Sequence, residues 1–123
     1  MICLSDQKRE LRTMALERRA KINKSVDTTH AAKSLELNFL TYFKPTRNVS
    51  IAVYWPIREE IDVFPLLCQL DTIGCLCFLP AVIGRQEPLQ FRIWKPGDNL
   101  VRSQLGILEP PVNHTIGTPD III

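Results

Sequence analysis

Apolar residues recur at helical spacing through the first third of the chain. From Ser5 to about Asn23 the apolar residues Leu11, Met14, Ala15 and Ile22 fall near one stripe, which predicts a helix capped by Ser5. A second helix is predicted from Asp27 or Thr28 to about Phe43. Its stripe is Ala31, Leu35, Phe39 and Tyr42, and Pro45 ends it. Both helices are amphipathic, so we expect them to bury their apolar sides against a sheet.

The middle of the chain alternates between strand-like and helix-like patterns. The predicted elements are a strand over 49–55, a helix over 62–70, a strand over 75–79 and a strand over 90–94. Asp62 can cap the helix, Pro65 is tolerated in its first turn, and Gly74 ends the unit. A strand, a helix and a strand joined by short connections predict a right-handed parallel crossover. After the turn at 96–98 and beyond Gly106 the chain is loop-like until Asp120.

The sequence ends on Asp120 followed by three isoleucines. Such a run is typical of the opening of a fully buried central strand, so we expect the domain to be incomplete at its C-terminus. The predicted organisation is one partial domain over residues 1–123, with N-terminal helices over 5–43 followed by a sheet region over 48–123.

Composition and charge narrow the class of protein. The chain has 123 residues, of which 46% are hydrophobic and 23% charged, which excludes disordered and fibrous classes. Apolar runs are short and no secretory signal is visible, so we expect a cytoplasmic protein without a membrane partner. The net charge of +2 is unevenly distributed, because residues 1–24 carry +4. That segment is either a solvated helix face or an anion-binding surface, and nothing indicates a nucleic-acid partner.

The four cysteines are Cys3, Cys68, Cys75 and Cys77. Cys75 and Cys77 alternate with apolar residues in a predicted strand, so their thiols should share one face. The two histidines, His30 and His114, are remote from them in sequence. Buried free thiols are therefore favoured over a zinc site, and no metal ligands can be identified in the chain.

The candidate site lies at the carboxyl end of the first predicted strand, where open α/β sheets bind ligands. It carries Tyr54, Trp55, Pro56, Arg58, Glu59 and Glu60. Aromatic rings beside carboxylates suit a flat heterocycle with ring N–H donors. Alternatively, Trp55 is a core residue and the two glutamates are the solvated start of a helix. The five glycines are scattered, so no glycine-rich phosphate loop is present.

Five motifs occur in the order of one known family. They are Lys8-Arg9-Glu10-Leu11-Arg12, Tyr54-Trp55-Pro56-Ile57-x-x-Glu60-Ile61-Asp62, Leu79-Pro80, Phe91-Arg92-x-Trp94-x-Pro96-Gly97-Asp98-x-Leu100 and Gly106-Ile107-x-Glu109-Pro110. In these motifs the chain resembles 5-formyltetrahydrofolate cyclo-ligase, also called methenyltetrahydrofolate synthetase. The resemblance runs from Lys8 to Ile123. Each motif is weak alone, but five in register are specific.

The resemblance implies an α/β fold, a Rossmann-like three-layer α/β/α sandwich with a mostly parallel sheet. It also implies an enzyme, monomeric when complete, that uses ATP and Mg²⁺ to cyclise 5-formyltetrahydrofolate to 5,10-methenyltetrahydrofolate. Phosphorylation of the formyl oxygen precedes attack by N10 and loss of phosphate. The segment Lys8, Arg9, Glu10, Leu11 and Arg12 matches the family's ATP-binding residues. Glu60 matches its catalytic, folate-orienting carboxylate, and Trp55 and Tyr54 match substrate-contacting positions.

The chain departs from the family after Ile123. Family members continue into a glycine-rich stretch ending in Gly-Tyr-Tyr-Asp, which wraps the ATP phosphates, and this stretch is absent from the 123 residues. Two basic side chains cannot replace a backbone N–H cradle. The alternative function is therefore a non-catalytic fragment or a folate-binding remnant.

Overall fold

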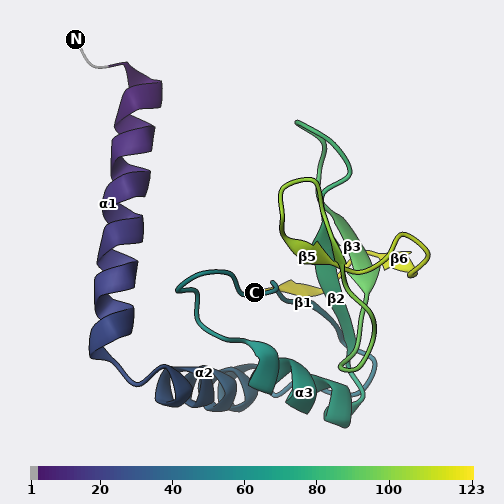
Figure 1. The fold of residues 1–123 in the computed structure, drawn as a ribbon. Helices are drawn as coiled ribbons and strands as arrows, with labels where there is room; N and C mark the ends of the chain where they lie inside the picture. The colour runs from purple at the N-terminus through teal and green to yellow at the C-terminus, as the bar shows by residue number, and fades with distance from the viewer. Residues whose placement is uncertain (1–2) are drawn as a thin grey trace.

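The structure is a computed structural model that describes residues 3–123 (Figure 1). The helices are α1 (Leu4–Ser25), α2 (Thr28–Phe43) and α3 (Phe64–Ile73). The strands are β1 (Ser50–Ala52), β2 (Leu76–Ala81), β3 (Gln90–Ile93), β4 (Val101–Arg102), β5 (Leu108–Glu109), β6 (Ile116–Gly117) and β7 (Ile121–Ile122). Each helix and long strand predicted from the sequence is present, whereas the short strands β4, β5 and β6 lie in segments without a predicted strand.

A five-stranded mixed sheet forms the centre of the molecule. Its strand order is β6-β3-β2-β1-β7, and a separate two-stranded ribbon joins β4 and β5. Strand β1 is parallel to β2 and β7, whereas β2 with β3 and β3 with β6 are antiparallel. The α/β class is therefore confirmed, but the expectation of a mostly parallel sheet is wrong. Residues 82–89 return the chain directly from β2 to β3 without a crossover helix, and such a connection yields an antiparallel pair.

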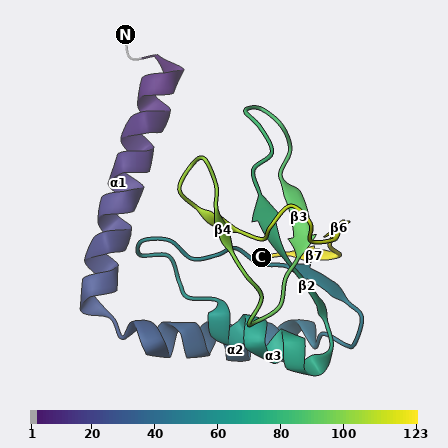
Figure 2. The ribbon, with the colours of Figure 1, turned by 45° about the vertical axis from the view of Figure 1, so that its right-hand side comes forward.

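Helix α3 supplies the predicted connection between parallel strands β1 and β2. Asp62 accepts a hydrogen bond from the backbone N–H of Phe64 at 2.9 Å, close to its predicted capping role. Gly74 ends the helix with φ of +100°, a conformation that glycine adopts without a steric penalty. The face of α3 turned inward contributes the fully buried side chains Leu66, Leu67 and Leu70. Figures 1 and 2 show α2 and α3 side by side, on one side of the sheet.

The core lies between these two helices and strands β1 and β2. Its buried members are Phe39, Ile51, Val53, Val63, Leu66, Leu67, Leu70, Cys75, Cys77, Leu79 and Trp94. Burying one such large side chain stabilises the fold by about 1.5–3 kcal/mol, so this cluster dominates the free energy of folding. Helix α2 begins within the predicted range, and Asp27 caps it, because its carboxylate accepts from the N–H groups of Thr29 and His30.

Helix α1 is present but does not pack as expected. Its predicted apolar stripe is exposed, with Leu11 at 65% and Met14 at 54%, and no residue of α1 is buried. Figures 1 and 2 show α1 standing away from the sheet. The prediction that α1 buries this stripe against the sheet is therefore wrong. Ser5 is not its cap either, because the helix begins one residue earlier, after Cys3.

One position of the predicted apolar stripe of α2 is exposed, and β7 lies at the edge of the sheet. Tyr42 was expected on the inner stripe of α2 but is 83% exposed, because the buried positions are Ala32, Glu36 and Phe39. Strand β7 pairs with β1 but has no second strand beyond it among the described residues, and Ile122 is 65% exposed. Within the described residues β7 therefore lies at the edge of the sheet, and the expectation that it becomes a central strand stays a prediction. None of the helices described is both long and apolar enough to cross a membrane.

Candidate functional site

The loop after β1 is a compact turn that fixes the orientation of Glu60. The backbone N–H of Glu60 donates to the carbonyl oxygen of Ile57 at 3.1 Å. In return, its Oε1 accepts from the N–H of Ile57 at 2.8 Å. Arg58 lies inside this turn with φ of +53°, a left-handed conformation that is uncommon for residues other than glycine. The Glu60 side chain is 29% exposed; its Oε1 holds the turn, and its Oε2 lies 4.0 Å from Nη1 of Arg19.

Tyr54 closes the loop from its other end. Its hydroxyl donates to the carbonyl oxygen of Ile61 at 2.7 Å. Burial raises the pKa of Tyr54, the carboxylates of Glu60 and Asp62 raise it further, and the Arg19 guanidinium opposes them. The phenol is therefore a neutral hydrogen-bond donor that is already occupied in holding the loop.

Trp55 belongs partly to the core and partly to the surface. Its ring lies edge-on to Phe64 at 6.1 Å and to Trp94 at 5.6 Å, measured between ring centroids. Trp94 is buried and its indole N–H donates to the carbonyl oxygen of Asn99 at 3.0 Å. Trp55 itself is half-buried, so it packs against the core, and its contact with a substrate stays a prediction. Its neighbours fix the ring, and part of it stays accessible to a ligand.

The basic segment at the start of α1 does not contact this loop. Its five residues, Lys8, Arg9, Glu10, Leu11 and Arg12, are all exposed. Arg9 pairs with Asp6 at 2.6 Å. Lys8 and Arg12 share a helical face with Arg19, the α1 residue that reaches the loop: its Nη1 lies 4.0 Å from Oε2 of Glu60. At 1.5 Å per residue, Lys8 lies about 16 Å along the helix from Arg19.

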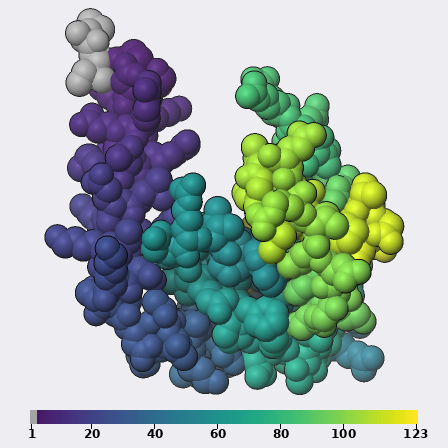
Figure 3. All heavy atoms as spheres, in the orientation of Figure 1, coloured from purple at the N-terminus to yellow at the C-terminus, as the bar shows by residue number. Residues whose placement is uncertain are grey.

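A broad hollow separates the upper part of α1 from the sheet region. Figure 3 shows it between the purple atoms of α1 and the green atoms of the loops beyond β2 and β4, with the teal loop after β1 near its base. The face of α1 that carries Lys8 and Arg12 continues into half-buried Leu16 and Arg19. Lys8 and Arg12 therefore lie on the side of α1 that also carries Arg19, the residue that reaches the loop of Tyr54, Trp55 and Glu60.

Two grooves lie elsewhere on the molecule. One of about 780 Å³ is at the C-terminal end of α2 and includes Tyr42 and Phe43. The other, of about 440 Å³, is lined by apolar residues of β3, β6 and β7 and their loops. Neither is lined by Tyr54, Trp55 or Glu60. These two grooves therefore lie apart from the candidate site residues.

The described residues do not fit a magnesium site. Magnesium prefers several oxygen ligands in octahedral geometry, and residues 3–123 contain no cluster of three or more His, Cys, Asp or Glu side chains that could hold a metal. Cys75 and Cys77 are free and buried, as predicted. Burial, with smaller contributions from Cys75 and Asp71, raises the pKa of Cys77 to about 12, so this thiol stays protonated and is a core residue.

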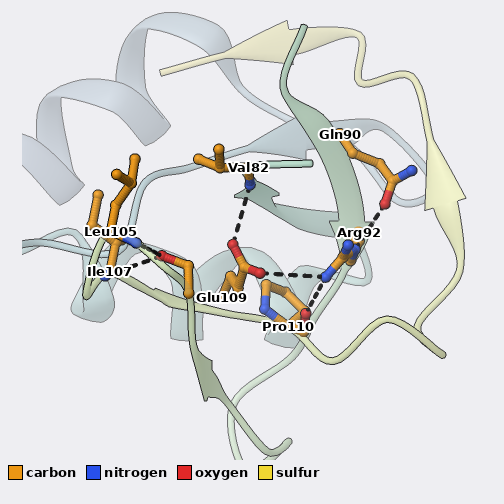
Figure 4. Close-up of polar contacts among 8 residues, drawn as sticks. Val82, Gln90, Arg92, Leu105, Ile107, Glu109 and Pro110 are labelled. Atoms are coloured by element: carbon orange, nitrogen blue, oxygen red, sulfur yellow. Dashed lines mark hydrogen bonds and ion pairs between the residues drawn. The ribbon is translucent and has the colours of Figure 1, made fainter. Parts of the chain in front are cut away.

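Sequence reasoning missed one buried charged pair that joins two of the recognised motifs. Arg92 donates to the carbonyl oxygen of Pro110 at 2.7 Å and lies 3.8 Å from Oε1 of Glu109 (Figure 4). Glu109 accepts from the backbone N–H of Val82 at 3.1 Å, and Gln90 accepts from Nε of Arg92 at 2.9 Å. These residues hold β3, β5 and the end of β2 together. The signal in the sequence that could have indicated this pair is Arg92 itself, a charged residue in a predicted strand two positions before Trp94.

Comparison with known proteins gives a match in structure. No protein-family model and no curated protein matches the chain. The NMR structure of Aquifex aeolicus 5,10-methenyltetrahydrofolate synthetase is similar to it with a TM-score of 0.66. The chain has the fold of this synthetase. The similarity covers 91% of this chain at 21% sequence identity, which supports the resemblance that the five motifs indicate.

The chain is shorter than the protein to which it is similar. This chain spans 59% of the length of the Aquifex synthetase. The likeness therefore concerns the common fold of helices and mixed sheet, in which the loop after β1 and helix α1 carry the predicted site residues.

Proposed function

We propose that the chain belongs to the 5-formyltetrahydrofolate cyclo-ligase family and takes part in the ATP-dependent conversion of 5-formyltetrahydrofolate to 5,10-methenyltetrahydrofolate. The observation that carries the proposal is the loop of Tyr54, Trp55 and Glu60 at the carboxyl end of β1. In this short loop half-buried Trp55 lies near a carboxylate that the turn holds through Oε1. This is the edge of an open sheet at which ligands bind.

The folate would bind through its flat ring system. A pterin presents N–H donors along one edge, and Glu60 has a carboxylate oxygen free of the turn to accept from them. A charge-assisted hydrogen bond of this type contributes about 1.5–3 kcal/mol, or roughly ten- to a hundredfold in affinity. Trp55 would contact an apolar part of the ligand. Tyr54 would act by holding the loop, because its hydroxyl is bonded to Ile61.

The nucleotide would lie along the inner face of α1. Lys8 and Arg12 are exposed, one turn apart and face the same side as Arg19, so they fit an anionic ligand that lies in the hollow. Arg9, Glu10 and Leu11 complete the matched segment. Bound ATP would supply the phosphoryl group that activates the formyl oxygen. We assign no step to a metal ion, because the described carboxylates do not gather into a site for one.

Family membership also implies a fold architecture, an oligomeric state and a cellular location. The mixed sheet with α2 and α3 on one side would form part of a Rossmann-like three-layer sandwich. The family relationship further implies a monomer of the cytoplasm, with a small-molecule substrate and no nucleic-acid or membrane partner.

The appearance of the methenyl product, which has its own absorbance, tests the reaction. Incubation of the chain with 5-formyltetrahydrofolate and magnesium ATP should yield this absorbance, and omission of ATP should abolish it. Lys8→Ala and Arg12→Ala should slow ATP use while folate affinity stays nearly unchanged. Arg18→Ala, an exposed α1 residue on another side of the helix, serves as the matched control. Equal rates in all three variants would show that Lys8 and Arg12 do not bind ATP and belong only to a solvated helix face.

A second candidate is folate binding without turnover. It is the alternative function that the sequence leaves open beside the cyclo-ligase reaction. Calorimetric binding of 5-formyltetrahydrofolate together with no methenyl product under any ATP concentration would select this candidate. Product formation would reject it.

A further inference from the structure

Arg19 is the one α1 side chain described as paired with a residue outside its own helix, and the sequence motifs do not include it. Its Nη1 lies 4.0 Å from Oε2 of Glu60, and its Nε is buried without a hydrogen-bond partner. The side chain as a whole is 39% exposed. Arg19 therefore retains an unused donor, and its guanidinium lies beside the carboxylate oxygen of Glu60 that does not hold the turn.

The charges around Arg19 are arranged asymmetrically. Tyr54 and the carboxylates of Glu60 and Asp62 come together on the loop, and the Arg19 guanidinium faces them from α1. Glu60 uses Oε1 to hold the turn at Ile57, which leaves Oε2 for the Arg19 guanidinium 4.0 Å away. Exposed ion pairs contribute little to stability, so the position of this pair matters more than its energy.

We propose that Arg19 is a positioning residue that holds the Glu60 carboxylate in the orientation in which it accepts from the folate ring and that anchors α1 against the loop. Only the part of this inference that concerns folate rests on the proposed function; the anchoring of α1 does not. It also explains the placement of α1, because half-buried Leu16, Arg19, Ala20 and Asn23 are the residues at helical spacing that turn toward the body of the protein.

The first readout needs no folate. Tyr54 and Tyr42 are the only two tyrosines, so Tyr42→Phe, a change at an exposed position, leaves Tyr54 as the single phenol seen by ultraviolet titration. In that background Arg19→Gln should raise the titration midpoint of Tyr54, because it removes the cation that opposes Glu60 and Asp62. Arg19→Lys should stay near the parent, and Arg18→Gln, which changes the adjacent exposed arginine, should have no effect.

The second readout is affinity for 5-formyltetrahydrofolate by calorimetry. Arg19→Gln should weaken binding about two- to fivefold, the change that corresponds to an exposed ion pair. Arg19→Lys should recover most of the loss, which a purely steric role would not allow.

The outcomes separate the two proposals. A midpoint shift in Arg19→Gln with no folate binding by the parent chain would overturn the folate function and leave the placement of Arg19 beside the loop standing. Folate binding by the parent with the same midpoint and affinity in Arg19→Gln and Arg18→Gln would overturn the inference and leave the function standing.

Discussion

Replacement of Arg92 by methionine should destabilise the protein more than any surface charge change. The side chains of Arg92 and Glu109 are only 6% and 12% exposed, and they lie 3.8 Å apart. Methionine keeps the apolar volume but leaves the Glu109 carboxylate without its cation and the Pro110 carbonyl without its donor. Removal of one partner of a buried pair costs about 3–5 kcal/mol.

Such a loss is large on the scale of the whole fold. Domains are stable by about 5–15 kcal/mol, and for a chain of this size 3–5 kcal/mol lowers Tm by roughly 10–20 °C. Urea unfolding followed by circular dichroism measures the change directly. Glu109→Gln is the matched variant, because its amide oxygen can still accept from Val82. In the double variant the loss should be clearly smaller than the sum of the single losses. A loss below about 1 kcal/mol in Arg92→Met would refute this account of the pair.

Three other outcomes follow from the packing. Cys77 should resist thiol-reactive probes at neutral pH until the protein unfolds, because burial raises its pKa to about 12; rapid labelling of the native chain would contradict this. Hydrogen bonds from Ser50 lower the pKa of Asp120. Its carboxylate therefore stabilises the fold above the unfolded-state pKa and loses that effect as the pH falls through the lowered value. Asp120→Asn should flatten the acid side of the plot of unfolding free energy against pH. Gly117→Ala should cost about 1–3 kcal/mol in chemical unfolding, since a Cβ would meet the Phe78 ring at 2.7 Å.

Local chemistry in the sequence predicts the elements well. Asp27 and Gly74 act through neighbouring backbone groups, so the start of α2 and the end of α3 could be inferred without any tertiary information. The parallel pairing of β1 with β2 likewise follows from the helix between them. The direction of β3 could not be inferred in the same way, because it depends on how residues 82–89 turn.

The sequence does not show how elements far apart in the chain are placed against one another. The apolar stripe of α1 predicts burial, yet Leu11 and Met14 are exposed, because the contact of α1 with the rest of the protein runs along a different face that includes Arg19. Glu60 could be selected as a candidate from its neighbours. Its second task, holding the turn, depends on the left-handed conformation of Arg58, which no periodicity indicates.

The central claim is that the loop after β1 recognises a reduced folate through Glu60. Calorimetric titration of 5-formyltetrahydrofolate into the parent chain, Glu60→Gln and Glu59→Gln tests it most directly. Glu59 is the adjacent residue and is also half-buried, so it controls for loss of charge in the same loop. The account predicts saturable binding to the parent, a roughly ten- to hundredfold loss in Glu60→Gln and nearly unchanged affinity in Glu59→Gln. Equal affinities in the two variants, or the reverse ranking, would contradict it.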